Sequence, residues 1–254
     1  MIFPKTPSFS LKNKRALVTG AGRGIGMGAA IALSSAGAEV LMVSRTTREL
    51  EIIDNYLRGL GHKCSYKSLD VTDEKAVSKL IKNEECFDIL VNNAGTNIPS
   101  SLVETKIEDF DYVMSLNVKS VINLTKNVVT KMLENNILGS IINVSSQMGH
   151  VGGPNRTTYC STKFALEGFT KSLAIELAPN GIRVNSICPT FIKTPMTEPF
   201  LKDKDFKNQV LSMIPLGRLG EVEDLMGPFV FLASEASSMM TGSSVLVDGG
   251  WTSR

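Results

Sequence analysis

A phenol and an ammonium group lie four residues apart in the stretch Tyr159-Cys160-Ser161-Thr162-Lys163. Apolar residues follow at helical spacing as far as Leu177, so the two polar groups are expected on one face of a helix. A phenol titrates near ~10 in water, and a neighbouring cation favours the phenolate and lowers that pKa. We therefore expect Tyr159 to exchange a proton with a substrate oxygen near neutral pH. Because Tyr-x-x-x-Lys also arises by chance, this role depends on support from the rest of the chain.

A second candidate is the glycine-rich sequence Thr19-Gly20-Ala-Gly-Arg-Gly24-Ile-Gly26, between a short apolar run and a helix of small residues. Glycines in such a turn let the backbone approach a pyrophosphate, and the following helix offers free N–H groups and the positive end of its dipole. The spacing is not the common Gly-x-Gly-x-x-Gly but fits Thr-Gly-x-x-x-Gly-x-Gly. The pattern favours a nucleotide site over a tight turn without a ligand.

Polar residues also close two later strands. Asn92-Asn93-Ala94-Gly95 ends one, at the carboxyl edge where open α/β sheets bind ligands, and its small residues would admit a flat ring or a ribose. Ser146 closes the next, thirteen residues before Tyr159, and could hydrogen-bond the same substrate oxygen. Ser145 is its neighbour, and periodicity alone does not choose between the two serines. Asn117 lies between two helical stretches, where an asparagine commonly caps a helix.

Strands and helices alternate along the chain, and the strands are mostly unbroken apolar runs, which indicates a parallel sheet covered on both faces. The predicted strands are Arg15–Thr19, Glu39–Val43, Lys63–Leu69, Phe87–Val91, Ser140–Val144, Arg183–Ile187 and Val245–Val247. The predicted helices are Ile25–Ala36, Thr47–Leu60, Asp73–Glu85, Lys106–Leu116, Val118–Asn135, the Tyr159 helix to about Ala178, one or two within Glu198–Met213, and Glu221–Ala233. No linker or repeat interrupts the pattern. We expect one α/β domain over residues 1–254, with a Rossmann-like, doubly wound, seven-stranded parallel sheet and a short N-terminal arm.

The composition excludes several classes of protein. The net charge is +2, from 27 basic and 25 acidic residues without a basic run, which argues against nucleic acid or an anionic membrane as partner. The four cysteines show no CxxC and no regular spacing, which indicates reduced thiols in a cytoplasmic protein and no metal site. No signal peptide is recognisable, and no apolar run approaches the ~18–20 residues of a membrane span.

In their order, these motifs resemble those of the short-chain dehydrogenase/reductase family, and the resemblance covers nearly the whole chain. It rests on the glycine-rich turn, Asp70, Asn92–Gly95, Asn117, Ser146, Tyr159-x-x-x-Lys163, Pro189 and Val247-Asp248-Gly249-Gly250. One departure is Thr190, where the family usually has glycine after the proline. Each motif is modest by itself, but the ordered set is specific.

The resemblance implies a role for each catalytic candidate. Tyr159 would be the general acid in carbonyl reduction or the base in alcohol oxidation, and the thirteen-residue spacing selects Ser146 over Ser145 as the group that holds the substrate oxygen. Lys163 would bind the nicotinamide ribose and lower the pKa of Tyr159, and Asn117 would hold a water in a proton relay. The residues expected to contact the cofactor are Gly20, Arg23, Gly24, Ile25, Gly26, Ser44, Arg45, Asp70, Val71, Asn92, Ala94, Gly95, Tyr159, Lys163, Pro189, Ile192 and Thr194.

The charges at the end of the second predicted strand favour one of the two nicotinamide cofactors, NADP(H) or NAD(H). A carboxylate at the end of the second strand would bind the ribose 2′-hydroxyl and repel a 2′-phosphate. Here that place holds Ser44, followed by Arg45, and Arg23 lies within the glycine-rich turn. Two guanidinium groups beside a neutral residue favour a phosphate, so NADP(H) is the expected cofactor. The alternative is that both arginines are exposed without a ligand.

The substrate is expected between residues 147–155 and 196–213, where His150 is interpreted as a loop residue. The C-terminal stretch from Asp248 and the stretch 215–220 resemble sugar-acid and polyol dehydrogenases of the gluconate 5-dehydrogenase kind. 3-Oxoacyl-carrier-protein reductases are a second reading. The arginines that dock the carrier in bacterial examples correspond to Ile137 and Asn180 here, although Arg183 lies nearby.

Two further hypotheses remain. A broad carbonyl reductase of the tropinone type would also carry a Ser-Arg pair after the second strand. A non-catalytic NADP(H) sensor or scaffold would be expected to lose Tyr159, Lys163 or Ser146, and all three are present. The resemblance also implies a homotetramer, or a homodimer. Apolar residues of Val118–Asn135 exceed one helical stripe, which suits a subunit contact, or else a helix buried within one subunit.

Overall fold

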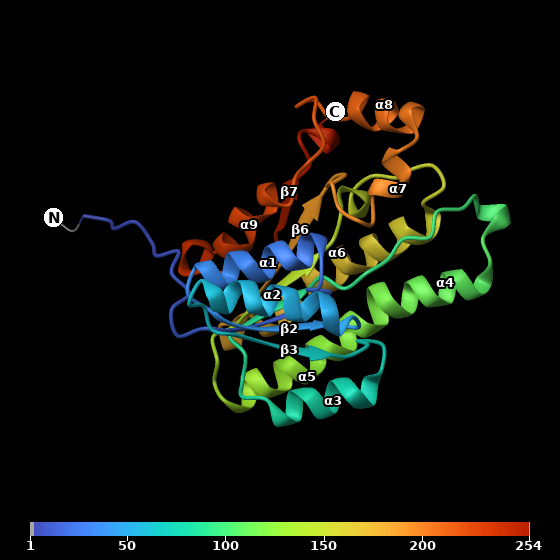
Figure 1. The fold of residues 1–254 in the computed structure, drawn as a ribbon. Coiled ribbons are helices and arrows are strands. Elements are labelled where there is room, and N and C mark those ends of the chain that lie inside the picture. Colours follow the sequence, from blue (N-terminus) through green and yellow to red (C-terminus); the bar gives the residue numbers. More distant parts are fainter. Residues whose placement is uncertain (1–2, 254) are drawn as a thin grey trace.

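The computed structural model describes residues 3–253, and a seven-stranded parallel sheet runs through its centre (Figure 1). The strands are β1 (Arg15–Thr19), β2 (Glu39–Ser44), β3 (Cys64–Ser68), β4 (Ile89–Asn92), β5 (Ser140–Val144), β6 (Arg183–Pro189) and β7 (Ser244–Val247). Their order is β3-β2-β1-β4-β5-β6-β7. The chain changes direction across the sheet between β1 and β4, which leaves a crevice at the carboxyl ends of the strands. The prediction of a doubly wound sheet is confirmed.

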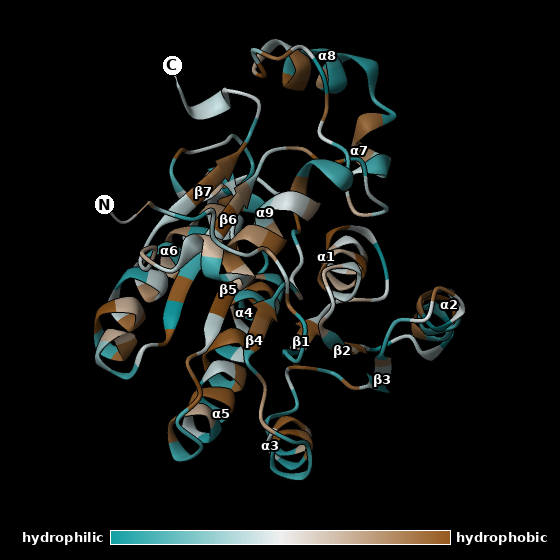
Figure 2. Cartoon of the chain, turned by 90° about the vertical axis from the view of Figure 1, so that its left-hand side faces the viewer, coloured by the Kyte–Doolittle hydropathy of each residue, from teal (hydrophilic) through white to brown (hydrophobic). Residues whose placement is uncertain are grey.

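Helices cover both faces of the sheet. The helices of residues 3–253 are α1 (Gly24–Ser35), α2 (Thr47–Gly59), α3 (Glu74–Asn83), α4 (Ile107–Met114), α5 (Ser120–Glu134), α6 (Thr157–Leu177), α7 (Glu198–Leu201), α8 (Lys204–Ser212) and α9 (Glu223–Ala233). Of these, α7 and α8 do not cover the sheet but lie beyond its end. In Figure 2 the hydrophobic side of α3 turns towards the sheet and its hydrophilic side turns outward.

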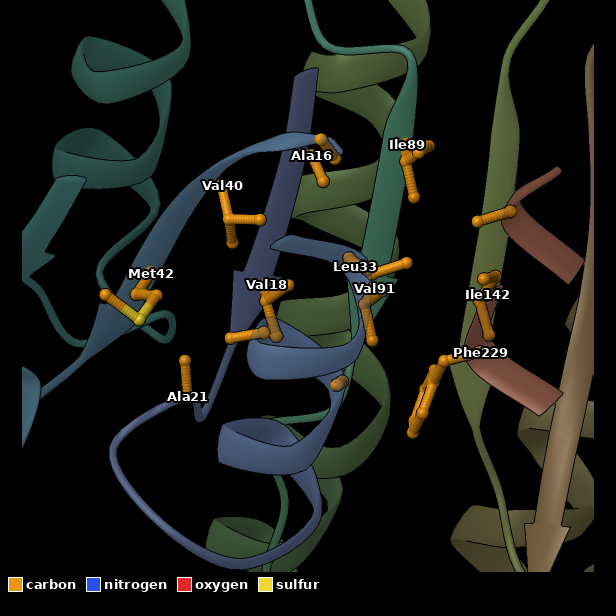
Figure 3. Packing of buried hydrophobic residues seen from close by; sticks show 14 of the residues in the cluster. Ala16, Val18, Ala21, Leu33, Val40, Met42, Ile89, Val91, Ile142 and Phe229 are labelled. Carbon is orange, nitrogen blue, oxygen red and sulfur yellow. The ribbon is translucent and has the colours of Figure 1, made fainter. Parts of the chain in front are cut away.

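Alternation along β1 shows how the two faces are filled. Ala16 and Val18 belong to a buried cluster with residues of α1, α2 and α9, whereas Leu17 between them belongs to one with residues of α3, α5 and α6. In Figure 3, Leu33 of α1 and Phe229 of α9 lie on the same face as Val18. Successive side chains of a strand point to opposite faces, so an unbroken apolar strand supplies both halves of the core.

The segment between β6 and β7 lies beyond the carboxyl end of the sheet (Figure 1). The stretch expected to hold one or two helices forms two, α7 and α8. They pack in a separate small apolar cluster, in which the ring of Phe191 lies 5.8 Å from both the Phe206 and the Trp251 ring. This cluster is independent of the two main cores, and it places α7 at the end of the sheet where the crevice opens.

Two further features bear on the class of protein. Across residues 3–253, no helix combines the length and the apolar character that crossing a bilayer requires. All four cysteines are free thiols; Cys64 and Cys188 are buried, and Cys86 and Cys160 are partly exposed.

Candidate active site

A cleft of about 280 Å³ opens at the carboxyl ends of the central strands. Its wall brings together most of the predicted site residues, which are far apart in the sequence. These are Gly20, Arg23, Gly24, Ile25, Ser44, Arg45, Asp70, Val71, Ala94, Gly95, Ser146, Tyr159, Lys163, Pro189, Ile192 and Thr194. Gly26, Asn92 and Asn117 are not part of the wall.

Gly26 and Asn92, which were expected to contact the cofactor, have packing roles in the structure. A Cβ atom on Gly26 would lie 2.3 Å from the carbonyl oxygen of Gly20, so only glycine lets α1 approach the preceding turn this closely. The Asn92 amide donates hydrogen bonds to Thr125 Oγ1 and Asn143 Oδ1, both at 2.9 Å. These bonds direct its side chain towards α5 and β5 rather than into the cleft.

Hydrogen bonds to the residues that follow β4 fix the conformation of the glycine-rich turn. Asn93 Nδ2 donates to the carbonyl oxygens of Thr19 and Gly20, at 2.9 and 3.2 Å. Thr19 Oγ1 accepts the N–H groups of Asn93 and Ala94 in return. Gly20 and Gly24 both have positive φ, and α1 begins at Gly24 without a side-chain cap. Uncapped N–H groups at the start of a helix form an anion site, as a pyrophosphate requires.

The end of the cleft that follows strand β2 contains two exposed arginines, Arg23 and Arg45, and each lies near a carboxylate. Arg23 Nη1 lies 3.5 Å from Glu49 Oε1, and Arg45 Nη1 lies 3.9 Å from Asp70 Oδ2. The buried Ser44 Oγ in the same cleft has no hydrogen-bond partner among residues 3–253. Two cations and an unsatisfied hydroxyl fit a ribose phosphate. We did not expect Glu49 in this site; the signal was an acidic residue in the first turn of the helix after Ser44 and Arg45.

Asp70 is fixed by its own loop. Its Oδ1 accepts hydrogen bonds from the N–H and the hydroxyl of Thr72, at 2.9 and 2.7 Å. Burial by itself would raise the pKa of Asp70, but these bonds and the charge of Arg45 outweigh it and the pKa is lowered. The carboxylate is therefore ionised at neutral pH, and it supports the loop that carries Val71 into the cleft wall.

Ser146 and Tyr159 meet at the opposite end of the cleft. Ser146 Oγ accepts the N–H of Met148 at 3.1 Å and donates to Gln147 Oε1 at 2.8 Å, so its position is fixed. Burial raises the pKa of Tyr159, and its interaction with Ser146 offsets part of that rise. Ser145 Oγ also lines the cleft, but it has no hydrogen-bond partner among residues 3–253, and its proximity to Glu167 helps to lower the pKa of that carboxyl. Of the two serines, Ser146 is thus the one that interacts with the phenol, and both groups line the same cleft.

The electrostatics of Tyr159 differ from the sequence-based expectation. The residue keeps some surface in the cleft, but protein encloses its phenol, and this burial raises the pKa of Tyr159 to about 12. The prediction that Lys163 lowers this pKa is wrong for the chain alone: the lowering contributions come from Ser146 and Arg156. Lys163 Nζ lies over the phenol ring, 5.4 Å from its centroid. At neutral pH the phenol is therefore protonated.

Lys163 is buried and donates one hydrogen bond to the carbonyl oxygen of Val144, at 2.9 Å. Burial lowers the pKa of Lys163 to about 8, against raising contributions from Cys188 and Glu167. An ammonium group has three donors, so two remain for ligands that enter the cleft. The lysine is ionised at pH 7 but titrates within the range in which enzymes are assayed.

Asn117 does not cap a helix, contrary to the expectation from its position. The two predicted helices are continuous through a π-helical turn, Ser115–Lys119. Asn117 is buried within this turn; its Oδ1 accepts the N–H of Thr96 at 2.8 Å, and its Nδ2 donates to Thr96 O and Thr162 Oγ1. A π turn leaves the regular ladder of backbone hydrogen bonds and occurs often at functional sites. Here it ties the β4 loop to α6, one residue before Lys163.

Glu167 is a buried carboxylate that we did not expect in the site. It lies four residues after Lys163 on α6, so Tyr159, Lys163 and Glu167 form one stripe along the helix, and this spacing was the available signal. Its carboxylate accepts hydrogen bonds from Ser186 and Ser244. Burial alone would raise the pKa of Glu167, but the hydroxyl donors outweigh it and lower the pKa. A buried negative charge therefore stands behind the buried ammonium group.

Comparison with known proteins agrees with this geometry. A family model described as enoyl-(acyl carrier protein) reductase matches residues 20–252. L-xylulose reductase of Mus musculus is 39% identical over 241 residues, which cover 95% of this chain and 97% of that protein. The 3-oxoacyl-[acyl-carrier-protein] reductase of Thermotoga maritima is 40% identical over 244 residues, covering 94% and 98%.

Solved structures give the same result. The gluconate 5-dehydrogenase of Burkholderia cenocepacia, in complex with NADP and tartrate, superposes with a TM-score of 0.93 at 32% identity, over 97% of this chain and 98% of that one. The matches span nearly the entire length of each protein and include the turn, the cleft and the Tyr159 helix. The chain belongs to the short-chain dehydrogenase/reductase family and is an oxidoreductase.

Proposed function

We propose that the protein transfers hydride between NADP(H) and the carbonyl or secondary alcohol carbon of a small polar compound, with Tyr159 as the general acid or base. The observation that carries this proposal is that Ser146, Tyr159 and Lys163 line the same cleft that holds Arg23 and Arg45 at its other end. A cleft with cationic groups at one end and a phenol at the other suits a dinucleotide, with the 2′-phosphate at the first end and the reacting atoms at the second.

The residues of the cleft fit the cofactor on two observations. The uncapped start of α1 at Gly24 offers N–H groups to a pyrophosphate. The buried hydroxyls of Ser44 and Thr190 both line the cleft without a hydrogen-bond partner among the described residues. Arg23 and Arg45 would hold the 2′-phosphate that distinguishes NADP(H) from NAD(H). Thr190, where the family usually has glycine, adds a hydroxyl to the cleft.

The chemistry at the catalytic end follows from the protonation states. Bound NADPH would supply the hydride that adds to the carbonyl carbon. Ser146 Oγ hydrogen-bonds the substrate oxygen, and the neutral Tyr159 phenol donates a proton to it. Because its pKa lies at about 12, the phenol is a proton donor at neutral pH, which favours the reductive direction. Lys163 directs its remaining N–H groups to the ribose beside the reacting ring.

Sugars, polyols and sugar acids are the proposed substrate class, since relatives named for L-xylulose and gluconate match over almost the whole chain. A carrier-bound thioester is the alternative, because a 3-oxoacyl-carrier-protein reductase is equally similar. Arg183, the arginine near the place where a carrier protein would dock, does not support this alternative. Arg183 is engaged by Ser237 Oγ and by the carbonyl oxygens of Leu232 and Ser234, so it is not free to dock a carrier.

A substrate screen with NADPH and NADH tests the proposal. L-Xylulose, keto derivatives of gluconate, an acetoacetyl thioester and a simple diketone are offered at equal concentration while cofactor absorbance is followed. We expect turnover of sugar-derived ketones with NADPH and much slower turnover with NADH. Preference for the thioester would select the carrier-protein reading. Tight NADPH binding with no oxidation on any substrate would contradict the enzymatic proposal in favour of a sensor.

We also propose that the protein is a homotetramer in the cytoplasm. Most of the apolar residues of α5 are buried within the subunit, and Ile122 is the exposed one among those that prompted the expectation. Exposed apolar side chains on α6, Phe164 and Ile175, add a surface that a second copy could cover. Sedimentation at micromolar concentration is expected to give a species about four times the 27.5 kDa subunit mass, and a pure monomer would contradict the proposal.

A further inference from the structure

Arg156 is a buried cation without a counter-ion. The residue is 8% exposed, and burial lowers the pKa of its guanidinium. Its one hydrogen bond runs from Nη1 to the carbonyl oxygen of the adjacent Asn155, at 3.1 Å, and no carboxylate within residues 3–253 pairs with it. Arginine stays charged in proteins. An unpaired buried charge is costly, so such a group is expected to find a partner when the protein functions.

Two other arginines that are largely enclosed by protein, Arg15 and Arg183, have partners for their charge. Arg15 contacts the carboxylates of Glu39 and Glu84, each at 3.2 Å. Arg183 donates to two carbonyl oxygens and one hydroxyl. The fold itself thus supplies partners for both, although Arg15 Nη1 makes no hydrogen bond among residues 3–253 and lies 3.9 Å from Glu85. Arg156 is more deeply buried than either and has the fewest partners, which indicates a role other than holding the fold together.

The position of Arg156 connects it to the substrate end of the cleft. It lies three residues before Tyr159, and its charge lowers the pKa of the Tyr159 phenol, so the two groups interact. Its guanidinium carbon lies over the ring of Phe200 in α7, 5.6 Å from the centroid. The residues just before α7, Pro195–Thr197, form part of the cleft wall. Arg156 therefore adjoins two segments of that wall, at the end opposite Arg23 and Arg45.

The local backbone favours an anion at the same place. Arg156 is the N-cap residue of α6, a helix of 21 residues, and its side chain makes no capping hydrogen bond. No acidic residue occupies the first turn of α6. The positive end of the helix dipole and its free N–H groups are thus not compensated by the chain. The Phe200 ring lies over one face of the guanidinium and lowers its exposure to solvent, which strengthens its attraction to an anion that enters.

We propose that Arg156 and the uncapped start of α6 bind a carboxylate of the substrate, so that the preferred substrates are keto acids or sugar acids rather than neutral ketoses or polyols. This inference rests on the proposed function, because it assigns the charge of the molecule that Tyr159 protonates. A carboxylate on Arg156 would orient the substrate, and its carbonyl group would point towards Ser146 and Tyr159.

Matched pairs of substrates test the proposal. 5-Ketogluconate and 2-ketogluconate are compared with the neutral ketoses of equal length, L-sorbose and D-fructose, using NADPH. We expect the better keto acid to exceed its neutral counterpart in kcat/KM by at least tenfold. Arg156→Gln is expected to lower kcat/KM for the acid by roughly 10- to 100-fold, as loss of a charged hydrogen bond does, and to change the ketose by less than about twofold. Lys171→Gln, an exposed charge change on the same helix, is the control.

Two readouts separate this inference from the proposed function. Binding of D-gluconate and of its neutral counterpart D-glucitol to the NADP-saturated protein is measured by calorimetry, which needs no turnover. Stronger binding of gluconate that is lost in Arg156→Gln, with the melting temperature retained, supports the inference even if no tested ketone reacts. Equal binding of both ligands, or equal loss for acid and ketose in the variant, overturns it while leaving NADPH-dependent reduction intact.

Discussion

The two ends of the cleft use charge in opposite ways. At one end, Arg23 and Arg45 are more than half exposed, and each lies 3.5–3.9 Å from a partly exposed carboxylate. At the other end, Tyr159 and Lys163 are enclosed, and burial raises the pKa of the phenol to about 12 and lowers that of the ammonium to about 8. Exposed pairs are screened by solvent and salt, whereas enclosed groups respond to each contact. We therefore expect changes at the exposed end to have small effects on the affinity for NADPH. Changes at the enclosed end are expected to have large effects on the rate of reduction.

The largest effect is expected at the enclosed end. Ser146→Ala removes the hydroxyl that would hold the substrate oxygen, and loss of one such donor typically lowers kcat about 100-fold or more. The matched control is Ser146→Thr, which keeps the hydroxyl. Because the site is enclosed, the ratio of wild type to Ser146→Ala is expected to be the same at low and high salt in steady-state assays. A decrease in kcat of less than threefold in Ser146→Ala would contradict the larger effect expected at the enclosed end.

The pH dependence of reduction follows from Lys163. With its pKa at about 8, the ammonium is present below pH 8 and is lost as the pH rises, so kcat/KM is expected to fall up to tenfold per unit above pH 8. The neutral phenol persists throughout this range because its pKa is about 12. Glu167 raises the pKa of Lys163, so Glu167→Gln should move the fall to lower pH. A profile that is flat to pH 10 in the wild type would contradict this assignment.

At the exposed end, Arg45→Ala is expected to raise the KM for NADPH roughly tenfold and to leave the KM for NADH nearly unchanged. The guanidinium contributes a charge-assisted bond to the 2′-phosphate, which NADH lacks. The effect should shrink as ionic strength increases, unlike that of Ser146→Ala. Equal changes for both cofactors would show that Arg45 does not read the phosphate.

The smallest effect concerns Glu49, whose carboxylate lies beside Arg23. Glu49→Gln removes a negative charge near the expected 2′-phosphate and frees Arg23, so NADPH should bind about 2- to 5-fold more tightly, the range of an exposed ion pair. Fluorescence titration with NADPH and NADH measures this difference. Weaker NADPH binding in the variant would mean that Glu49 positions Arg23 for the phosphate rather than competing with it.

The sequence predicts the sheet well because its strands are local apolar runs, such as Ser140–Val144, whose type does not depend on distant contacts. It also predicts the glycine turn, since positive φ at Gly20 and Gly24 requires glycine. The π turn at Ser115–Lys119 was not predictable, because it depends on the bonds of Asn117 to Thr96 and Thr162, far along the chain.

The protonation states of Tyr159 and Lys163 could not be predicted from the sequence either, because they also depend on residues far along the chain. The expected lowering of the Tyr159 pKa used its neighbour Lys163, but burial by distant elements dominates both groups. Glu167 and Arg156 were overlooked as well. Each is an ordinary charged residue on a helix until the fold shows that one is surrounded by hydroxyl donors and the other has no counter-ion.

The most direct test of the account follows the hydride itself. The protein is incubated with NADPH deuterated at the transferable position of the nicotinamide and with the best ketone of the screen, and the product is analysed by mass spectrometry and NMR. The account predicts one deuterium on the new carbinol carbon, and no product from Tyr159→Phe, which should still bind NADPH. Unlabelled product, or an active Tyr159→Phe enzyme, would contradict it.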